Sequence, residues 1–188
     1  MGVSGLSRRA VFLDRDGVIN RAIVRGGKPY PPSSLEELEI VEGCAEALNA
    51  LKERGLLLIV VTNQPDVARG KQSRDAVERM HEALASALPI DEILTCFHDD
   101  NDENCDCRKP KPGLLLQAAR RNALELSNSF LIGDRWRDID AAHAVGCQAV
   151  WIDQGYDERG PSRPPEARVD SLADAVAWIV GRVDASRW

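Results

Sequence analysis

Four side chains that commonly bind metal ions lie within one twelve-residue stretch of this chain. Cys96 and His98 are followed by Cys105 and Cys107. Three thiolates and one imidazole complete a tetrahedral zinc shell and leave no open position for a substrate. The spacing therefore predicts a structural Zn²⁺ that holds a loop at 96–107 in place. A redox-active cluster or an iron site is the alternative, which the histidine and the tight spacing disfavour.

Carboxylates and polar groups elsewhere in the chain could act together on a phosphate ester. Asp14 and Asp16 are two positions apart, and Asp134 adds a third carboxylate. Oxygen ligands with retained waters are what Mg²⁺ prefers. A metal-bound carboxylate stays ionised and can attack phosphorus, while a second carboxyl group protonates the leaving oxygen and later deprotonates water. The Thr62 hydroxyl and the Lys109 ammonium would stabilise charge on the transferring group.

The elements that must position these groups alternate between strands and helices. Short apolar runs predict strands at 10–13, 56–61, 91–95, 129–132 and 147–152. Amphipathic stretches predict helices at 43–53, 73–88, 113–126, 139–145 and 171–183. Such alternation is typical of an α/β fold with a doubly wound, Rossmann-like parallel sheet. Ligands of these sheets bind outside the carboxyl ends of the strands, so the polar groups that follow the strands should converge on one edge.

Composition bounds the kind of protein. A chain of 188 residues fits one phosphatase-sized domain, here expected over 1–188 with a flexible N-terminal tail at 1–9. The net charge of −6 disfavours a nucleic-acid binder, and no apolar run is long enough to span a membrane. Five cysteines, three of them clustered, indicate metal binding in a reducing cytoplasm and not a disulfide framework. We expect a cytoplasmic protein, a monomer, that binds a small phosphorylated metabolite.

The residues that carry this chemistry resemble the four motifs of the haloacid dehalogenase superfamily of phosphatases. The match runs from about residue 12 to about residue 150. The motifs are Asp14-Arg15-Asp16-Gly17, Thr62-Asn63, Lys109, and Gly133-Asp134 with Asp138. The zinc loop and the Arg108-Lys109-Pro110 that follows it resemble one branch of the superfamily. That branch holds the D-glycero-D-manno-heptose-1,7-bisphosphate 7-phosphatases and the histidinol-phosphate phosphatases.

The resemblance implies a role for each carboxylate. Asp14 would be the nucleophile and Asp16 the general acid and base. Catalytic Mg²⁺ would be held by Asp14, the main-chain carbonyl of Asp16 and Asp134, with Asp138 behind them. The structural zinc on Cys96, His98, Cys105 and Cys107 is likewise a feature of the branch.

The resemblance also implies which residues meet the substrate. Thr62 and Lys109 would grip the phosphoryl group, and Asn63, Arg108 and Arg135 would bind the rest of the molecule. The segments between the motifs are filled by one helix, one strand and loops each, which leaves no room for a separate cap domain. We therefore expect an open site shaped by a loop at 21–32, the segment after Thr62 and the zinc loop.

Several sequence features bear on which of the branch's substrates this protein hydrolyses. Thr62-Asn63-Gln64 with Ala68-Arg69-Gly70-Lys71 is similar to the heptose phosphatases, as is the basic Arg135. Pro65-Asp66-Val67 departs from that pattern, and the short gap between His98 and Cys105 is closer to the histidinol-phosphate type. Removal of the 7-phosphate from D-glycero-D-manno-heptose 1,7-bisphosphate is the favoured reaction, with histidinol phosphate or another small sugar phosphate as the alternative.

Each motif also has an interpretation that involves no catalytic or binding function. An Asp-x-Asp pair alone is most often a solvated turn, and an Arg-Lys pair is usually solvent-exposed. His81, His143, Cys44 and Cys147 are expected to be packing or surface residues, and one of Arg135 and Arg137 to point to solvent. A phospho-accepting receiver or a zinc-stabilised binding module could share the same sheet. A receiver has no reason to carry a zinc loop beside its lysine.

Overall fold

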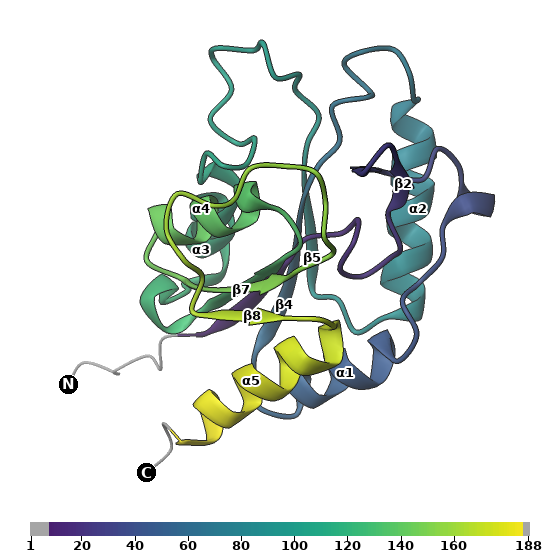
Figure 1. Ribbon diagram of the computed structural model, residues 1–188. Coiled ribbons are helices and arrows are strands. Elements are labelled where there is room, and N and C mark those ends of the chain that lie inside the picture. Colours follow the sequence, from purple (N-terminus) through teal and green to yellow (C-terminus); the bar gives the residue numbers. More distant parts are fainter. Residues whose placement is uncertain (1–7, 186–188) are drawn as a thin grey trace.

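The computed structural model describes residues 8–185 (Figure 1). Within this range six parallel strands form one sheet in the order β5-β4-β1-β6-β7-β8. This is the doubly wound α/β sheet predicted from the sequence. The strands are β1 (Ala10–Leu13), β4 (Leu57–Asn63), β5 (Glu92–Cys96), β6 (Phe130–Gly133), β7 (Gln148–Ile152) and β8 (Ala167–Val169).

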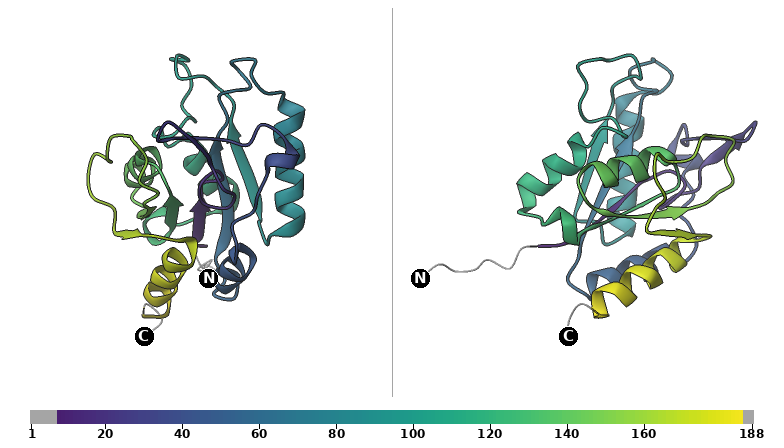
Figure 2. Two further views of the ribbon diagram at one scale, coloured as in Figure 1. Left: turned by 45° about the vertical axis from the view of Figure 1, so that its right-hand side comes forward. Right: turned by 60° about the vertical axis from the view of Figure 1, so that its left-hand side comes forward.

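Helices cover both faces of the sheet (Figures 1 and 2). On one face α1 (Cys44–Lys52) and α5 (Leu172–Ala185) pack against each other and the strands, and α2 (Arg74–Ala87) adds Leu84 to the same core. On the other face α3 (Gly113–Asn122) and α4 (Trp136–Ala144) enclose a second core. Because β1 lies between these cores, all four of its residues are buried, as its unbroken apolar run predicted.

The sequence prediction missed three strands. The edge strand β8 has only three residues, and the middle one, Arg168, is exposed. The expected loop at 21–32 contains an antiparallel hairpin of β2 (Ile23–Arg25) and β3 (Lys28–Tyr30). Half-exposed strands this short carry no apolar run, so nothing in their local pattern marked them.

Two helix boundaries also differ from the prediction. Helix α3 ends at Asn122 because Ala123 adopts a left-handed conformation with φ 51°, and the 3₁₀ turn η2 (Leu126–Asn128) follows. Helix α4 begins three residues earlier than expected, at Trp136. Its start is stabilised by a capping box in which Asp138 accepts a hydrogen bond from the Arg135 amide at 3.1 Å. A second 3₁₀ turn, η1 (Leu35–Glu37), follows the hairpin.

The predicted flexible tail at 1–9 falls mostly outside the described residues. Its last two positions are bound to the domain: the Arg8 carbonyl accepts from the Glu125 amide at 2.9 Å and the Arg9 carbonyl from the Leu57 amide at 3.0 Å. Within residues 8–185 each helix is too short or too polar to cross a bilayer.

Candidate active site

Lys109 connects groups from three different elements of the fold. Its ammonium lies 2.8 Å from Oδ1 of Asp14, which follows β1, and 2.6 Å from Oδ1 of Asp138, in the first turn of α4. It also donates to the carbonyl oxygen of Val61 in β4 at 2.6 Å. Groups far apart in the chain therefore meet at the carboxyl edge of the sheet, as the strand-end rule predicted.

The lysine is almost completely enclosed, with 2% of its surface exposed. Burial opposes its charge, but the carboxylates of Asp138 and Asp14 outweigh burial and raise the pKa of Lys109 above its ordinary value. The ammonium is thus a permanent positive charge at the base of the site. Placed there, it can stabilise negative charge on a transferring group.

Three buried carboxylates crowd together beside this lysine. Oxygen atoms of Asp14, Asp134 and Asp138 lie within 4.8 Å of one another. Burial and the neighbouring carboxylates raise the pKa of Asp14 to about 6 and that of Asp134 well above its ordinary range. Both oxygens of Asp134 are buried without a hydrogen-bond partner among residues 8–185. An enclosed, unpaired carboxylate beside others is the donor set that a hard divalent cation such as Mg²⁺ fits.

Asp16 lies outside that cluster and is held by donors from three residues. Arg15 makes a bidentate pair with it, with Nη2 at 2.9 Å and 3.0 Å from the two carboxylate oxygens. The side-chain amides of Asn20 and Gln64 donate to it at 3.0 Å and 2.8 Å. The carboxyl group keeps 15% of its side-chain surface exposed, on the wall of a cavity. It is the second acidic group within reach of a bound ligand.

Thr62 lies at the end of β4 and is buried. The amide of Gln64 donates to its Oγ1 at 2.8 Å. A hydroxyl that accepts a hydrogen bond keeps its own hydrogen available. Thr62 can therefore donate to an oxygen of a ligand in the cavity that it lines.

Asn63 was predicted to bind substrate, but its side chain holds the main chain of Lys109. Its Nδ2 donates to the Lys109 carbonyl at 3.0 Å, and its Oδ1 accepts from the Lys109 amide at 3.1 Å. This pair of bonds fixes the lysine relative to β4. Asn63 also lines the cavity, so contact with a ligand stays a prediction.

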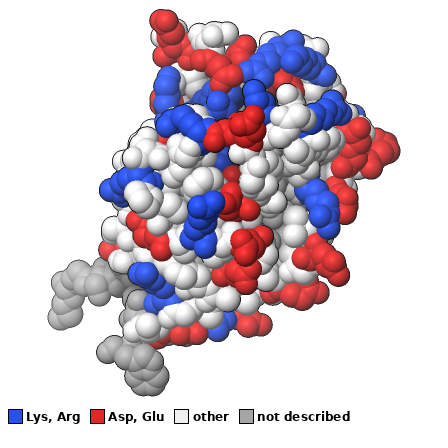
Figure 3. Space-filling model, viewed as in Figure 1, with Lys and Arg blue, Asp and Glu red and all other residues white. Residues whose placement is uncertain are grey.

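The site opens into a cavity of about 450 Å³ lined by the strand ends, the hairpin and the zinc loop. Its wall carries eight cations together with seven carboxylates. Basic and acidic side chains gather over this upper part of the molecule in the space-filling view (Figure 3). The lining cations are Arg25, Lys28, Arg69, Lys71, Arg108, Lys109, Arg135 and Arg137.

Both arginines that were predicted to bind substrate have acidic partners. Arg108 donates from Nε to Asp100 at 2.8 Å, and its Nη1 is buried without a partner among the described residues. Arg135 pairs with Glu158 through Nε at 2.9 Å. Arg137, like Arg135, is half-buried and lines the cavity, so the expectation that one of the two points to solvent stays a prediction.

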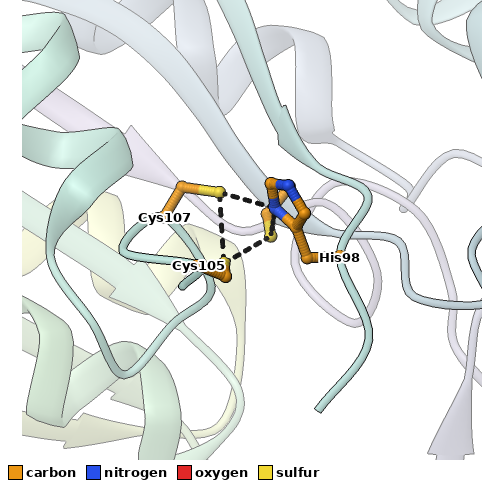
Figure 4. A group of neighbouring side chains, drawn as sticks. His98, Cys105 and Cys107 are labelled. Atoms are coloured by element: carbon orange, nitrogen blue, oxygen red, sulfur yellow. Dashed lines mark hydrogen bonds between the residues drawn. The ribbon is translucent and has the colours of Figure 1, made fainter. Parts of the chain in front are cut away.

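The four predicted zinc ligands lie together in the loop at 96–107. The Cys96 Sγ is 3.5 Å from the His98 Nδ1 and 3.7 Å from the Cys105 Sγ. The Cys107 Sγ is 3.2 Å from the same histidine nitrogen and 3.5 Å from the Cys105 Sγ. Figure 4 shows His98, Cys105 and Cys107 pointing toward one another. Ligand atoms at the corners of a tetrahedral zinc site are separated by about 3.5–3.8 Å, so the cluster fits Zn²⁺.

Sequence reasoning missed the residues that support the carboxylates. Gln64 bridges Thr62 and Asp16, and Arg15 is completely buried against Asp16. Tyr156, far along the chain, lies near Asp134, and burial together with this carboxylate raises the pKa of Tyr156. Gln64 and Arg15 stood inside the motifs, and that adjacency was their only signal. Tyr156 lies in a segment with no motif at all.

Comparison with known proteins agrees with this fold. A HAD-hydrolase-like family model matches residues 106–177. A D-glycero-β-D-manno-heptose-1,7-bisphosphate 7-phosphatase of Pseudomonas aeruginosa is 36% identical over 176 residues, which are 89% of this chain and 96% of that protein. One of Helicobacter pylori is 40% identical over 181 residues, with 92% and 98% covered.

Solved structures show the same similarity. The crystal structure of D,D-heptose 1,7-bisphosphate phosphatase from B. bronchiseptica, complexed with magnesium and phosphate, has a TM-score of 0.74 and 26% identity and covers 93% of this chain and 99% of that one. The fold, the carboxylate edge and these relatives define a phosphoric monoester hydrolase. The chain belongs to the haloacid dehalogenase-like family of phosphatases.

Proposed function

We propose that this phosphatase removes the 7-phosphate of D-glycero-D-manno-heptose 1,7-bisphosphate in a Mg²⁺-dependent reaction. The observation that carries the proposal is the convergence of Asp14, Lys109 and Asp134 at one edge of the sheet, beside a cavity lined by basic and acidic side chains. The relatives of 36–40% identity that bear this activity in their names support the choice of substrate.

The reaction would proceed through an aspartyl-phosphate. An oxygen of Asp14 attacks phosphorus, and the bond from phosphorus to the sugar oxygen breaks. Asp16 gives its proton to that oxygen, which keeps the electron pair of the broken bond. Water then attacks the phosphorus of the aspartyl-phosphate and loses its proton to Asp16, which releases phosphate and restores Asp14.

Charge on the transferring group would be balanced from two sides. Lys109 and the free hydrogen of Thr62 would stabilise the phosphoryl oxygens. Asp14, the Asp16 carbonyl and Asp134 would hold Mg²⁺, which when bound neutralises phosphoryl charge. Both side-chain oxygens of Asp138 are already bound, to Lys109 and to the Arg135 amide, which supports its place behind the metal ligands.

The outer part of the cavity supports a substrate with a second anionic group. Arg137 forms no ion pair with any residue of 8–185, and burial and the cations Arg135 and Arg108 lower its pKa. The unpartnered Nη1 of Arg108 adds a second free donor. Guanidinium groups held close together favour an anion between them. The second phosphate of a bisphosphate meets this requirement, whereas the ammonium of histidinol phosphate does not.

Phosphate release from a substrate panel tests the proposal. Native protein with Mg²⁺ should hydrolyse heptose 1,7-bisphosphate and leave heptose 1-phosphate intact, and Asp14→Asn should release none. Equal or faster turnover of histidinol phosphate would favour the alternative that the short spacing between His98 and Cys105 suggested. Absence of Mg²⁺-dependent release from every ester would contradict the mechanism.

The cysteines bear on the compartment and the second metal. Cys96, Cys105 and Cys107 are free thiols in contact, which needs a reducing environment or a bound cation. We therefore place the enzyme in the cytoplasm with a structural Zn²⁺ in the loop at 96–107. One zinc per chain in protein purified without added metal is the expected measurement.

A further inference from the structure

A buried polar chain reaches Asp16 from helix α2. His81 is 6% exposed, and its Nε2 lies 3.1 Å from Nη1 of Arg15. Arg15 itself is completely buried. On its other side the same guanidinium contacts Asp16 through Nε at 3.1 Å and Nη2 at 2.9 Å. One planar group thus joins a histidine of α2 to the acidic residue after β1.

The direction of the hydrogen bond fixes the form of the histidine. A guanidinium can only donate, so Nε2 of His81 must accept and the ring hydrogen must lie on Nδ1. That nitrogen faces Oε2 of Glu78 at 3.7 Å. Burial and the nearby Arg15 cation lower the pKa of His81 to about 4, so the ring is neutral at pH 7.

The Nη1 group of Arg15 requires a neutral hydrogen-bond acceptor, and His81 supplies one. The guanidinium is rigid and planar, so a bond at Nη1 sets the plane in which Nε and Nη2 present their hydrogens to Asp16. Without an acceptor at Nη1, a buried charged donor would lose its partner, and the guanidinium would turn to find another.

We propose that His81 is a positioning residue for proton transfer: through Arg15 it orients the carboxyl group of Asp16 toward the ester oxygen. The inference rests on the proposed role of Asp16 as general acid. As the bond from phosphorus to the ester oxygen breaks, the oxygen keeps the electron pair and takes the proton of Asp16. A displaced carboxyl group would slow this step for a leaving oxygen that needs the proton and would not slow it for one that leaves as a stable anion.

Two esters of similar size separate this role from a structural one. Nitrophenolate leaves as a stable anion and needs no proton, whereas the benzyl alkoxide is a strong base and does. His81→Leu should lower kcat/KM for benzyl phosphate by about tenfold or more, part of the 10²–10⁴ that acid catalysis supplies. The value for 4-nitrophenyl phosphate should stay within about threefold of native, by the same reasoning. A similar loss on both esters, or no loss on either, would overturn the proposal.

Conservative variants complete the test. His81→Gln, whose amide oxygen can accept from Arg15, should recover the benzyl phosphate rate, and His81→Asn, which is too short, should not. This pair decides the matter if His81→Leu does not fold. His143→Leu, on α4 beside Glu166, is the matched control and should leave both rates unchanged.

Asp16→Asn distinguishes this inference from the proposed function. A selective loss on benzyl phosphate in Asp16→Asn, without one in His81→Leu or His81→Asn, would overturn only the role of His81. The lack of any selective loss in Asp16→Asn would overturn the acid role of Asp16 and, with it, the inference.

Discussion

Gly17 lies directly against Asp134: a Cβ atom added to the glycine would come within 1.8 Å of the carboxylate Oδ2. The glycine also has φ +90°, a backbone conformation that residues with a side chain rarely adopt. The turn after β1 can therefore pass beside the buried carboxylate only because position 17 has no side chain. This close approach brings Asp134 to the same edge as Asp14.

Gly17→Ala should damage the site beyond the strain of the backbone. The added methyl group must displace Asp134, so we expect activity to fall at least tenfold and the Mg²⁺ concentration for half-maximal activity to rise. Gly26→Ala is the control, because Gly26 also has positive φ, +56°, and nothing lies within 4 Å of its Cβ position. Each substitution should cost about 1–2 kcal/mol of backbone strain in thermal unfolding. Equal activity in both variants would contradict the clash.

Lys109→Met should abolish most activity and also destabilise the fold. The variant leaves the buried Asp14 and Asp138 without their cation, and removal of one partner of a buried pair costs about 3–5 kcal/mol. Chemical unfolding monitored by circular dichroism measures this loss. Lys52→Met, which removes a partly exposed lysine paired with Asp91 at 2.7 Å, should change stability by about 1 kcal/mol or less.

Cys107→Ser should release zinc and lower the melting temperature, because structural zinc contributes directly to folding. Since Arg108 and Lys109 follow the cysteine, activity should fall as the loop loosens. Zinc content by atomic absorption and the melting temperature are the measurements. Cys147→Ala, a buried thiol outside the cluster, should keep the zinc of the native protein. Unchanged zinc content in Cys107→Ser would rule out this cysteine as a ligand.

His81 makes stability depend on pH in a defined window. Its folded pKa of about 4 lies below its ordinary value of 6.5, so between these values the unfolded chain binds more protons than the folded one. Stability contributed by the neutral ring is therefore present above pH 6.5 and is lost as pH falls toward 4. His81→Gln should lose less stability than native protein between pH 7 and pH 5. Parallel melting curves for the two proteins would exclude this source of acid sensitivity.

The local hydrophobic pattern of the sequence predicted the strands that are buried on both faces of the sheet. It missed the edge strand β8 and the β2–β3 hairpin. β1 and β4 are unbroken apolar runs because both faces of the central sheet are covered. β8 and the β2–β3 hairpin are short and half-exposed, so their residues carry no such run. The cluster of Cys96, His98, Cys105 and Cys107 was predictable because its members are neighbours in the chain.

Residue types and spacing predicted the sheet, the meeting of carboxylates with Lys109 at its edge, and the cluster of three cysteines with His98, because each depends on a pattern that is readable within short segments of the chain. Only the tertiary structure decided that Asn63 clamps the Lys109 backbone, that Gln64 joins Thr62 to Asp16, and that a histidine of α2 reaches Arg15. Such contacts depend on how separate elements pack. Hydrogen bonds between side chains that are distant in the chain produce no regular residue spacing from which they could be predicted.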